Sequence, residues 1–265
     1  SLIENGYYNV SCPAGGATQV DGLQVKESQI FKAWDTGIYL SGGCANVRLI
    51  GDVIQSNGQD GTGSGVYFHG DDLSLEGGII EESGGRGVYL DDAHFVVISG
   101  MKVAANGLQS STTGAASPGL QIDASQSVTV SGNNFMGSGG DVSNGAHVLL
   151  SGTSDNLTFS GNTYAPTIDR NGNAIPAYVY DVAANATLTN THFYETAEQP
   201  AVSVFSPAAQ PILASLVVPQ FTQNQLGGLV MSNDSSSSTN VIDIAPGRRP
   251  TARTRRSSSC PPDAR

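Results

Sequence analysis

The stretch "GVYLDDAHFVVISGMKVAANG" (87–107) joins two runs of alternating apolar residues through a short charged segment. Val88 and Leu90 alternate before that segment, and Val96 and Ile98 alternate after it. A period of two is typical of β-strands that bury one face. The stretch therefore predicts two short strands and a turn, and its charged residues are either a functional site or an ordinary solvated turn.

The part of this stretch after the charged segment recurs along the chain. Each copy holds an apolar pair two residues apart, then a glycine, then an apolar residue three positions later. The copies read "VRLIGDVIQSNG" (47–58), "LSLEGGIIEESG" (73–84), "VVISGMKVAANG" (96–107), "VTVSGNNFMGSG" (128–139), "LTFSGNTYAPTI" (157–168) and "ATLTNTHFYETA" (186–197). The shared glycine position is held by Gly51, Gly77, Gly100, Gly132 and Gly161, with Asn190 in the last copy. The intervals of 26, 23, 32, 29 and 29 residues are those of a solenoid coil.

Two all-β architectures offer short strands with regular turns. Consecutive strands of a β-sandwich pair as hairpins, and nothing there makes equivalent residues recur at each turn of the chain. In a parallel β-helix each coil stacks on the last, so equivalent side chains form ladders about 4.8 Å apart. The aligned glycine and apolar columns predict ladders. We therefore expect an all-β, single-stranded parallel β-helix of about seven or more coils.

The coil pattern "G[VI]Y[LF]…[IL].G…I..[SA].G" resembles the right-handed parallel β-helix proteins of the pectin-lyase-like superfamily. The resemblance covers residues 20–205 and implies a right-handed solenoid. Its members include pectate lyases, polygalacturonases, alginate-modifying enzymes, bacteriophage tailspikes and non-catalytic adhesins. It implies an extracellular or virion-associated protein acting on a polysaccharide that lies along the side of the solenoid, as a lyase or glycoside hydrolase. The alternative is a non-catalytic carbohydrate-binding or structural module, and homotrimers, common in tailspikes, are a further expectation.

The composition agrees with one solenoid domain. The chain holds 33 Gly and is only 13% charged, which favours turns and strands over helices. We expect the β-helix to span 1–233, with clear coils over 20–205 and an irregular cap over 206–233. Residues 234–265 are expected to form a low-complexity linker and a basic, disordered tail, to which we assign no function.

The charge distribution excludes some partners. The formal net charge is −11, but six Arg and Asp263 lie in the last 18 residues, so 1–246 carries 6 basic and 22 acidic residues, or −16. Nucleic acids need clustered Lys and Arg, so we expect no nucleic-acid partner. No apolar run reaches 18 residues, so we expect no membrane partner. Three cysteines are too few for a disulfide framework or a zinc site, although a Cys12–Cys44 bridge stays open.

Acidic residues recur in the turn after the first strand of successive coils. If the coils stack, these carboxylates form one column, with His69 and His94 beside it. Carboxylates on adjacent coils would lie about 5 Å apart, and those two coils apart about 10 Å, which brackets the separations used by glycosidases. They could instead bind Ca²⁺, which bridges acidic sugars in lyases of the superfamily, or be ordinary turn residues. The column comprises Asp71, Asp72, Asp91, Asp92 and Asp123.

A second candidate group lies in "GGIIEESGGRG" (77–87). Arg86 is the only basic residue between Arg48 and Lys102, so it would be the cation that neutralises a uronate in a lyase. The alternative is a local ion pair with Glu81 or Glu82. The expected catalytic residues are thus Asp71, Asp72, Asp91, Asp92, His94 and Arg86, and the expected substrate-binding residues are Tyr39, Tyr89, Glu81, Glu82 and Asp123. Tyr39 and Tyr89 would stack on sugar rings, whereas Phe68 alternates with the core set and should be buried.

Overall fold

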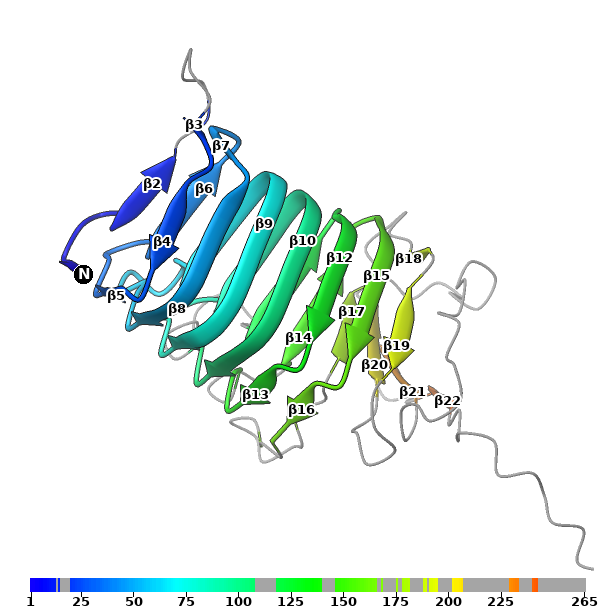
Figure 1. Cartoon of the computed structure of the whole chain (residues 1–265). Helices are drawn as coiled ribbons and strands as arrows, with labels where there is room; N and C mark the ends of the chain where they lie inside the picture. The colour runs from blue at the N-terminus through cyan, green and yellow to red at the C-terminus, as the bar shows by residue number, and fades with distance from the viewer. Residues whose placement is uncertain are drawn as a thin grey trace, which may run out of the picture.

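The computed structural model describes residues 1–12, 14, 20–107, 118–139, 146–165, 168, 175, 178–181, 188–189, 191–194, 202–206, 229–233 and 240–242. Within this part every regular element is a β-strand, and no helix is long and apolar enough to span a membrane. The strands stack as successive coils along one axis (Figure 1).

The coils form three faces of parallel strands, here called face 1, face 2 and face 3. Face 1 contains β2 (Val10–Cys12), β6 (Ile38–Ser41), the starts of β9 (Val66–Glu81) and β10 (Val88–Ala104), β11 (Leu120–Asp123), β14 (Val148–Ser151), β17 (Tyr178–Asp181), β20 (Val202–Ser206) and β21 (Leu229–Asn233). Face 2 contains β4 (Gln24–Lys26), β8 (Val47–Gln55), the middles of β9 and β10, β12 (Gln126–Ser131), β15 (Ser154–Ser160) and β18 (Leu188–Thr189). Face 3 contains β1 (Leu2–Glu4), β5 (Gln29–Phe31), the ends of β8, β9 and β10, β13 (Asn134–Met136) and β16 (Thr163–Tyr164).

Three further pairings complete the described strands. β3 (Val20–Asp21) pairs with β7 (Cys44–Ala45) outside the three faces, whereas β19 (His192–Tyr194) pairs with the end of β15 in face 2, and β22 (Asn240–Ile242) runs antiparallel to β21 at the edge of face 1. The strand β22 lies inside the range expected to be a linker. The remaining residues of 234–265 lie outside the described part of the chain, as does most of the expected cap at 206–233, of which β21 stacks parallel to β20.

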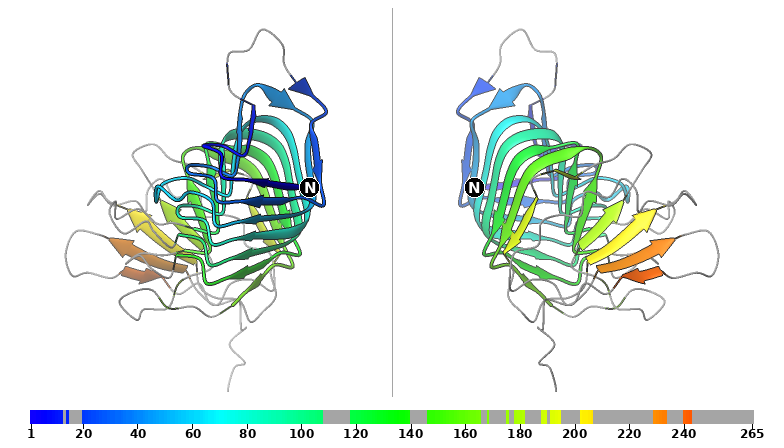
Figure 2. Two further views of the ribbon diagram at one scale, coloured as in Figure 1. Left: turned by 90° about the vertical axis from the view of Figure 1, so that its left-hand side faces the viewer. Right: turned by 90° about the vertical axis from the view of Figure 1, so that its right-hand side faces the viewer.

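The register confirms the all-β parallel solenoid. Val96 pairs with Leu73 on the preceding coil and with Val128 on the following one, which no sandwich of hairpins would produce. Five successive coils, which start at β6, β9, β10, β11 and β14, place a strand in every face, and the coil of β2, β4 and β5 precedes them. Viewed along the stack, the coils lie one behind another (Figure 2).

The core is a set of ladders inside the coils. Face 1 contributes Leu40, Phe68, Leu90, Ile122 and Leu150, which occupy one register column and are all buried. Phe68 is fully buried, as the alternation predicts. Because each coil buries its side chains against the coils on both sides, hydrophobic stabilisation is distributed along the stack.

The recurring glycine is explained by its backbone conformation. Gly51, Gly77, Gly100, Gly132 and Gly161 all have φ between +54° and +65°. A Cβ added at Gly77, Gly132 or Gly161 would meet nothing within 4 Å. Glycine is therefore selected at this corner by the left-handed conformation, which costs other residues free energy, rather than by crowding.

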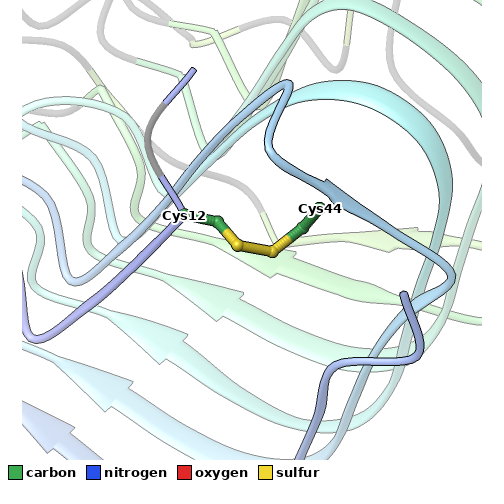
Figure 3. The surroundings of a disulfide bond; sticks show 2 residues. All are labelled: Cys12 and Cys44. Atoms are coloured by element: carbon green, nitrogen blue, oxygen red, sulfur yellow. A yellow bond between two sulfur atoms is a disulfide. The ribbon is translucent and has the colours of Figure 1, made fainter. Parts of the chain in front are cut away.

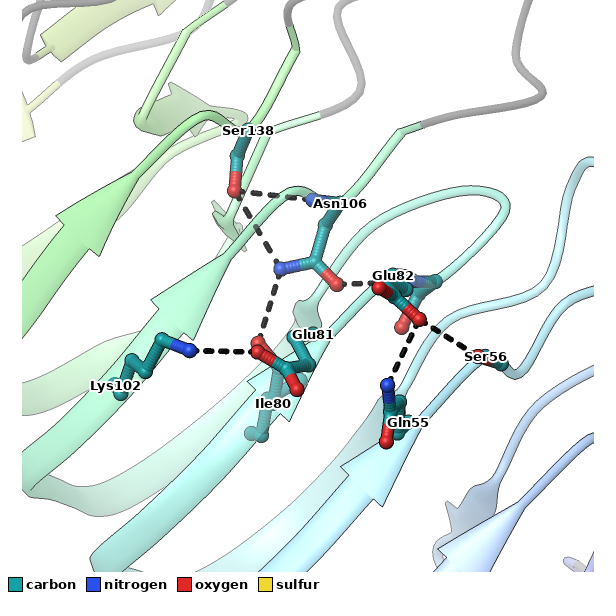
Figure 4. A network of polar contacts seen from close by, with 9 residues as sticks. Gln55, Ser56, Ile80, Glu81, Glu82, Lys102, Asn106 and Ser138 are labelled. Atoms are coloured by element: carbon teal, nitrogen blue, oxygen red, sulfur yellow. Dashed lines mark hydrogen bonds and ion pairs between the residues drawn. The ribbon is translucent and has the colours of Figure 1, made fainter.

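Asparagine side chains inside two other corners connect one coil to the next. Asn133 accepts a hydrogen bond from the Met101 amide (2.9 Å) and donates to the Ile98 carbonyl (3.0 Å), three residues earlier. Asn106 does the same with the Ser83 amide (3.0 Å) and the Ile80 carbonyl (3.2 Å), and also contacts Ser138 (Figure 4). Asn57 and Asn162 repeat the geometry. These buried amides satisfy backbone groups that the corner leaves without ladder partners.

Asp52 occupies the position that Asn133 and Asn162 hold in later coils. Its Oδ1 accepts from the Ser28 amide (2.8 Å), but Oδ2 is buried without a partner among the described residues. Burial raises the pKa of Asp52, against hydrogen bonds from backbone amides that lower it. A carboxylate cannot donate to the carbonyl three residues before Ser28, that of Val25, as an amide would.

We therefore expect Asp52→Asn to stabilise the fold by about 2 kcal/mol at pH 7, because the amide adds a donor and removes a buried charge. The raised pKa of Asp52 means that its contribution to stability is present below the unfolded-state pKa and is lost as pH rises through the folded-state pKa. The gain should hence be larger at pH 7 than at pH 4. Urea unfolding at both values measures it, and a variant less stable than wild type at pH 7 would contradict this account.

His147 is a buried histidine next to β14. Its Nε2 donates to the Ala165 carbonyl (3.1 Å), and its Nδ1 has no hydrogen-bond partner in the described part of the chain. Burial lowers the pKa of His147 to about 4, although the hydrogen bond to Ala165 opposes the shift. The ring is therefore neutral in the folded protein at pH 5–8.

We expect this histidine to cost stability in acid. Above about pH 6.5 neither state is protonated at His147, and between pH 6.5 and 4 only the unfolded chain takes up the proton. The free energy of unfolding should fall by about 3 kcal/mol over that interval. His147→Gln should remove this part of the pH dependence, measured by urea unfolding from pH 7 to 4. If the free energy of unfolding fell equally with pH in wild type and His147→Gln, the low pKa of His147 would not be the cause.

Cys12 and Cys44 form a disulfide (Figure 3). Their Cα atoms lie 5.9 Å apart, and the bridge ties the end of β2 to β7 across 32 residues of sequence. The bridge that the sequence left open is thus present, and it joins the first two coils.

Candidate functional site

The outward side of face 1 carries the carboxylates Asp91 and Asp123. Leu90 points into the core, so its neighbours Tyr89 and Asp91 point outward, as strand alternation requires. Asp91 on β10 is the direct register partner of Asp123 on β11, and both side chains are half-buried. Neighbouring strands lie about 4.8 Å apart, so the sequence-predicted pairing of these two carboxylates on adjacent coils is confirmed.

Each of these carboxylates accepts a hydrogen bond from a tyrosine on the preceding coil. The Tyr67 hydroxyl donates to Asp91 Oδ2 (2.7 Å), and the Tyr89 hydroxyl donates to Asp123 Oδ2 (3.4 Å). Burial and then the hydrogen bond to Asp91 raise the pKa of Tyr67 well above its usual range. Burial, with the charges of Asp91 and Asp123, raises the pKa of Tyr89 to about 12. Both hydroxyls therefore stay protonated and act as donors at neutral pH.

Arg86 completes this group. Its Nε donates to Gln121 Oε1, and its Cζ lies 4.5 Å from the centroid of the Tyr89 ring. Gln121 in turn donates to Ser151 Oγ (3.2 Å) on the next coil. Burial lowers the pKa of Arg86, while the charges of Tyr89, Asp123 and Asp91 raise it, and a guanidinium stays charged in either case. We call Tyr67, Arg86, Tyr89, Asp91, Gln121 and Asp123 the face 1 site.

The tyrosines of face 1 form a column along the stack. Tyr8 stacks on Tyr39 (centroids 4.4 Å, 11°), Tyr39 stacks on Tyr67 (4.9 Å, 12°), and Tyr67 meets Tyr89 edge to face (5.4 Å, 72°). Both faces of Tyr39 are therefore covered, and Arg86 lies over Tyr89. The predicted stacking of Tyr39 on a sugar ring is corrected, because its two faces are taken by Tyr8 and Tyr67. Arg86 covers the Tyr89 ring from one side, and stacking of Tyr89 on a sugar stays a prediction.

The other candidate carboxylates lie in a separate cluster. Nδ1 of His94 is 2.9 Å from Asp71 Oδ1, and Nε2 is 3.7 Å from Asp92 Oδ1, with both carboxylates exposed. His94 is the register partner of Asp71, whereas a bulge in β10 between Leu90 and Ala93 turns Asp92 outward. The single column of five carboxylates expected from the sequence is hence wrong, because Asp71 is in register with His94 and Asp92 lies in the bulge, so neither lines up with Asp91 and Asp123.

Asp72 and His69 join neither group through the contacts that the structure shows. Asp72 is exposed at a left-handed corner position (φ 62°), where Asn46, Phe95, Ser127 and Asn156 stand in the other coils. His69 ends a face 1 strand and pairs in register with Ser41. The geometry of Asp72 is that of a turn residue.

Glu81 and Glu82 lie at the far end of β9, on face 3. Glu81 Oε2 accepts from Lys102 Nζ (2.7 Å), and Glu82 Oε2 accepts from Gln55 (2.8 Å) and Ser56 (3.0 Å) (Figure 4). Arg86 turns instead toward face 1. The expected grouping of Glu81, Glu82 and Arg86 is therefore not formed, and the local ion pair uses Lys102 rather than Arg86.

Two members of the face 1 site, Tyr67 and Gln121, were missed by the sequence analysis. Both occupy the position of Tyr39 and Tyr89 in the coil pattern, so the alignment contained the signal. Among the described residues, no group of three or more His, Cys, Asp or Glu side chains gathers in a way that could hold a metal ion. Bound Ca²⁺ remains a prediction, with Asp91 and Asp123 as the oxygen ligands that face 1 offers.

The face 1 site brings together groups suited to acid–base chemistry. Two carboxylates on adjacent coils, two phenolic donors and one cation line the same surface, and each is fixed by a hydrogen bond or ring contact to its neighbours. Such a pair can act on a bond placed between its members, one group as acid and the other as base or nucleophile.

Comparison with known proteins agrees with the architecture. A family model described as "Right handed beta helix region" matches residues 14–165. No curated protein matches the sequence. Among solved structures, the enzymatically active domain of tailspike protein 2 of bacteriophage CBA120 superposes with a TM-score of 0.53 at 14% identity. That match covers 87% of this chain but 34% of the tailspike chain, so this chain spans about a third of it. The likeness shows a shared fold.

Proposed function

Because the chain belongs to the right-handed β-helix family, we propose that it binds a polysaccharide along face 1 and cleaves it as a glycoside hydrolase. The tailspike whose fold it shares is described as enzymatically active, which supports an enzymatic reading. The proposal rests on one observation: Asp91 and Asp123 are register partners on adjacent coils, and each is held by a tyrosine hydroxyl.

The spacing of the pair suggests how it would act. Retaining glycosidases hold their two carboxyl groups about 5–5.5 Å apart, close to the strand spacing of about 4.8 Å. Asp91, oriented by the shorter tyrosine hydrogen bond, would attack the anomeric carbon, and Asp123 would protonate the leaving oxygen. Water would then hydrolyse the glycosyl ester, with Asp123 as the base.

The charges favour a hydrolase over a lyase. A lyase acting on a uronate must neutralise the sugar carboxylate with a cation or Ca²⁺. Arg86 is engaged by Gln121 and Tyr89 and lies near two carboxylates, so little of its charge is free for a substrate anion. Residues 1–246, with a formal charge of −16, would also repel an acidic polymer.

Product analysis tests the proposal. We would incubate the full chain with neutral polysaccharides (dextran, xylan, galactomannan, laminarin) and acidic ones (polygalacturonate, alginate), with and without chelator. New reducing ends without unsaturated sugars support the hydrolase. Unsaturated ends that disappear on chelation would instead identify a calcium-dependent lyase, in which Asp91 and Asp123 would be candidate ligands.

A second candidate function is non-catalytic carbohydrate binding. The hydrogen bonds from Tyr67 and Tyr89 favour it, because they are also what a purely structural ladder of polar groups would form. Binding of a polysaccharide without any cleavage would support this function.

An extracellular or virion-associated location is part of either proposal and is supported by the Cys12–Cys44 disulfide, which persists in oxidising surroundings. A homotrimer stays a proposal. A mass three times that of the chain in light scattering would support it.

A further inference from the structure

Two large aromatic side chains stand exposed at one end of the tyrosine column. Tyr7 is 59% exposed and Trp34 is 56% exposed. The Trp34 amide donates to the Gly6 carbonyl (2.9 Å), and the Asp35 amide donates to the Tyr7 carbonyl (3.1 Å). These bonds place Tyr7 and Trp34 in register on adjacent coils, so their side chains leave the backbone about one strand spacing apart.

Tyr7 is continuous with the face 1 site through ring contacts, and Trp34 is its backbone neighbour on the next coil. Tyr7 meets Tyr8 edge to face (4.8 Å, 77°), and Tyr8 begins the column that passes through Tyr39 to Tyr67, the residue that holds Asp91. A chain molecule that lies along the stack and reaches Asp91 would therefore pass over Tyr7 and Trp34 if it continued toward the first coil.

Two carboxylates, those of Asp35 and Asp60, lie near Tyr7. The charge of Asp35 is the main cause that raises the pKa of Tyr7, and it also raises that of Tyr8, where burial dominates. The Asp60 amide donates to the Trp34 carbonyl (3.0 Å), and the Asp60 carboxylate on this next coil accepts from Thr62 and Gly63 in its own turn. Lys32 is a cation two residues before Trp34 in the sequence. Apolar rings bordered by carboxylates complement an uncharged sugar, whose ring carbons are apolar and whose hydroxyl groups are donors.

We propose that Tyr7 and Trp34 form a stacking subsite for a pyranose ring of a neutral saccharide chain. This subsite rests on the proposed function, because it binds a distal part of the chain that is cleaved at Asp91 and Asp123. It also supplies the stacking role that Tyr39 cannot perform with its covered faces. The binding energy from stacking at this subsite would position the saccharide chain along face 1.

Trp34 is the single tryptophan of the chain, so intrinsic tryptophan emission reports on this subsite alone. We would titrate the protein with oligosaccharides of dextran, xylan, galactomannan and laminarin and record emission and acrylamide quenching. A saccharide that the protein cleaves should shift the emission to shorter wavelength and protect Trp34 from the quencher, because the sugar covers the indole.

Variants separate stacking from folding. Trp34→Ala and Tyr7→Ala should each raise KM about tenfold with kcat little changed, whereas Trp34→Phe should keep most of the affinity. Phe95→Ala is the matched control, since Phe95 is 61% exposed at a different corner, and it should change neither constant.

The outcomes distinguish this subsite from the proposed function. Cleavage of a saccharide with unchanged Trp34 emission and quenching, and with unchanged KM in Trp34→Ala, would overturn the subsite and leave the hydrolase standing. Absence of both binding and cleavage for every polysaccharide would overturn the two together.

Discussion

If face 1 cleaves a polysaccharide as proposed, replacing Asp91 by Asn is expected to lower the rate by about a thousandfold, the usual contribution of a catalytic carboxylate. Asn retains an oxygen that can accept from the Tyr67 hydroxyl, so the variant loses the charge and keeps the contact. The folded structure should thus persist, with an unchanged circular dichroism spectrum and unfolding midpoint. Asp123→Asn should have a loss of the same order, because the pair acts as a unit.

Asp71→Asn provides the control for this prediction. It removes the same charge from the cluster around His94, which lies outside the face 1 site, and its rate should stay within about twofold of wild type. Initial rates of reducing-end formation measure all three variants. Full activity in Asp91→Asn together with a large loss in Asp71→Asn would move the active site to the His94 cluster.

Removing the disulfide should cost about 4 kcal/mol of the free energy of unfolding. The bridge closes a loop of 32 residues, and the chain-entropy model assigns a stabilisation of this size to such a loop. Because coils contact only their neighbours, the loss should be concentrated in the first coils. Urea unfolding of Cys12→Ser/Cys44→Ser measures the total, and hydrogen exchange of β2 and β6 shows where it falls.

The third cysteine supplies the matched control. Cys260→Ser should leave the unfolding midpoint unchanged, and a reducing agent should destabilise wild type but not the double variant. Equal midpoints for wild type and Cys12→Ser/Cys44→Ser would show that the bridge adds nothing to stability.

Much of the fold follows from the sequence because stacking turns a repeat into a ladder. The glycine column marks one left-handed corner, and the apolar pairs mark the core of each strand. The pairing of Asp91 with Asp123 was predictable for the same reason, since both residues follow the same apolar position in their coils.

Side-chain direction at the corners could not be predicted in the same way. The segment from Leu90 to Val96 is one residue longer than the segment from Phe68 to Leu73, but length alone does not say where the extra residue bulges. That local choice separates Asp92 from Asp91. Likewise, Arg86 has carboxylates on two sides, and only the path of the turn shows that it packs on Tyr89.

Tyr39 shows a second reason why the role of a side chain could not be predicted from the sequence. An aromatic ring near a turn is equally compatible with stacking on a ligand or on its own neighbours. The repeat places a tyrosine at the same position on adjacent coils, and the strand spacing then lets Tyr39 and Tyr67 cover each other. Exposed aromatic side chains stand instead at Tyr7 and Trp34.

The central claim is that Asp91 and Asp123 cleave a glycosidic bond on face 1, and the anomeric configuration of the first product tests it most directly. Proton NMR of a cleaved oligosaccharide should show new reducing ends that retain the configuration of the substrate, because the two carboxylates lie on adjacent coils. These ends should be absent with Asp91→Asn. Inverted or unsaturated ends, or equal product from Asp91→Asn, would contradict the account.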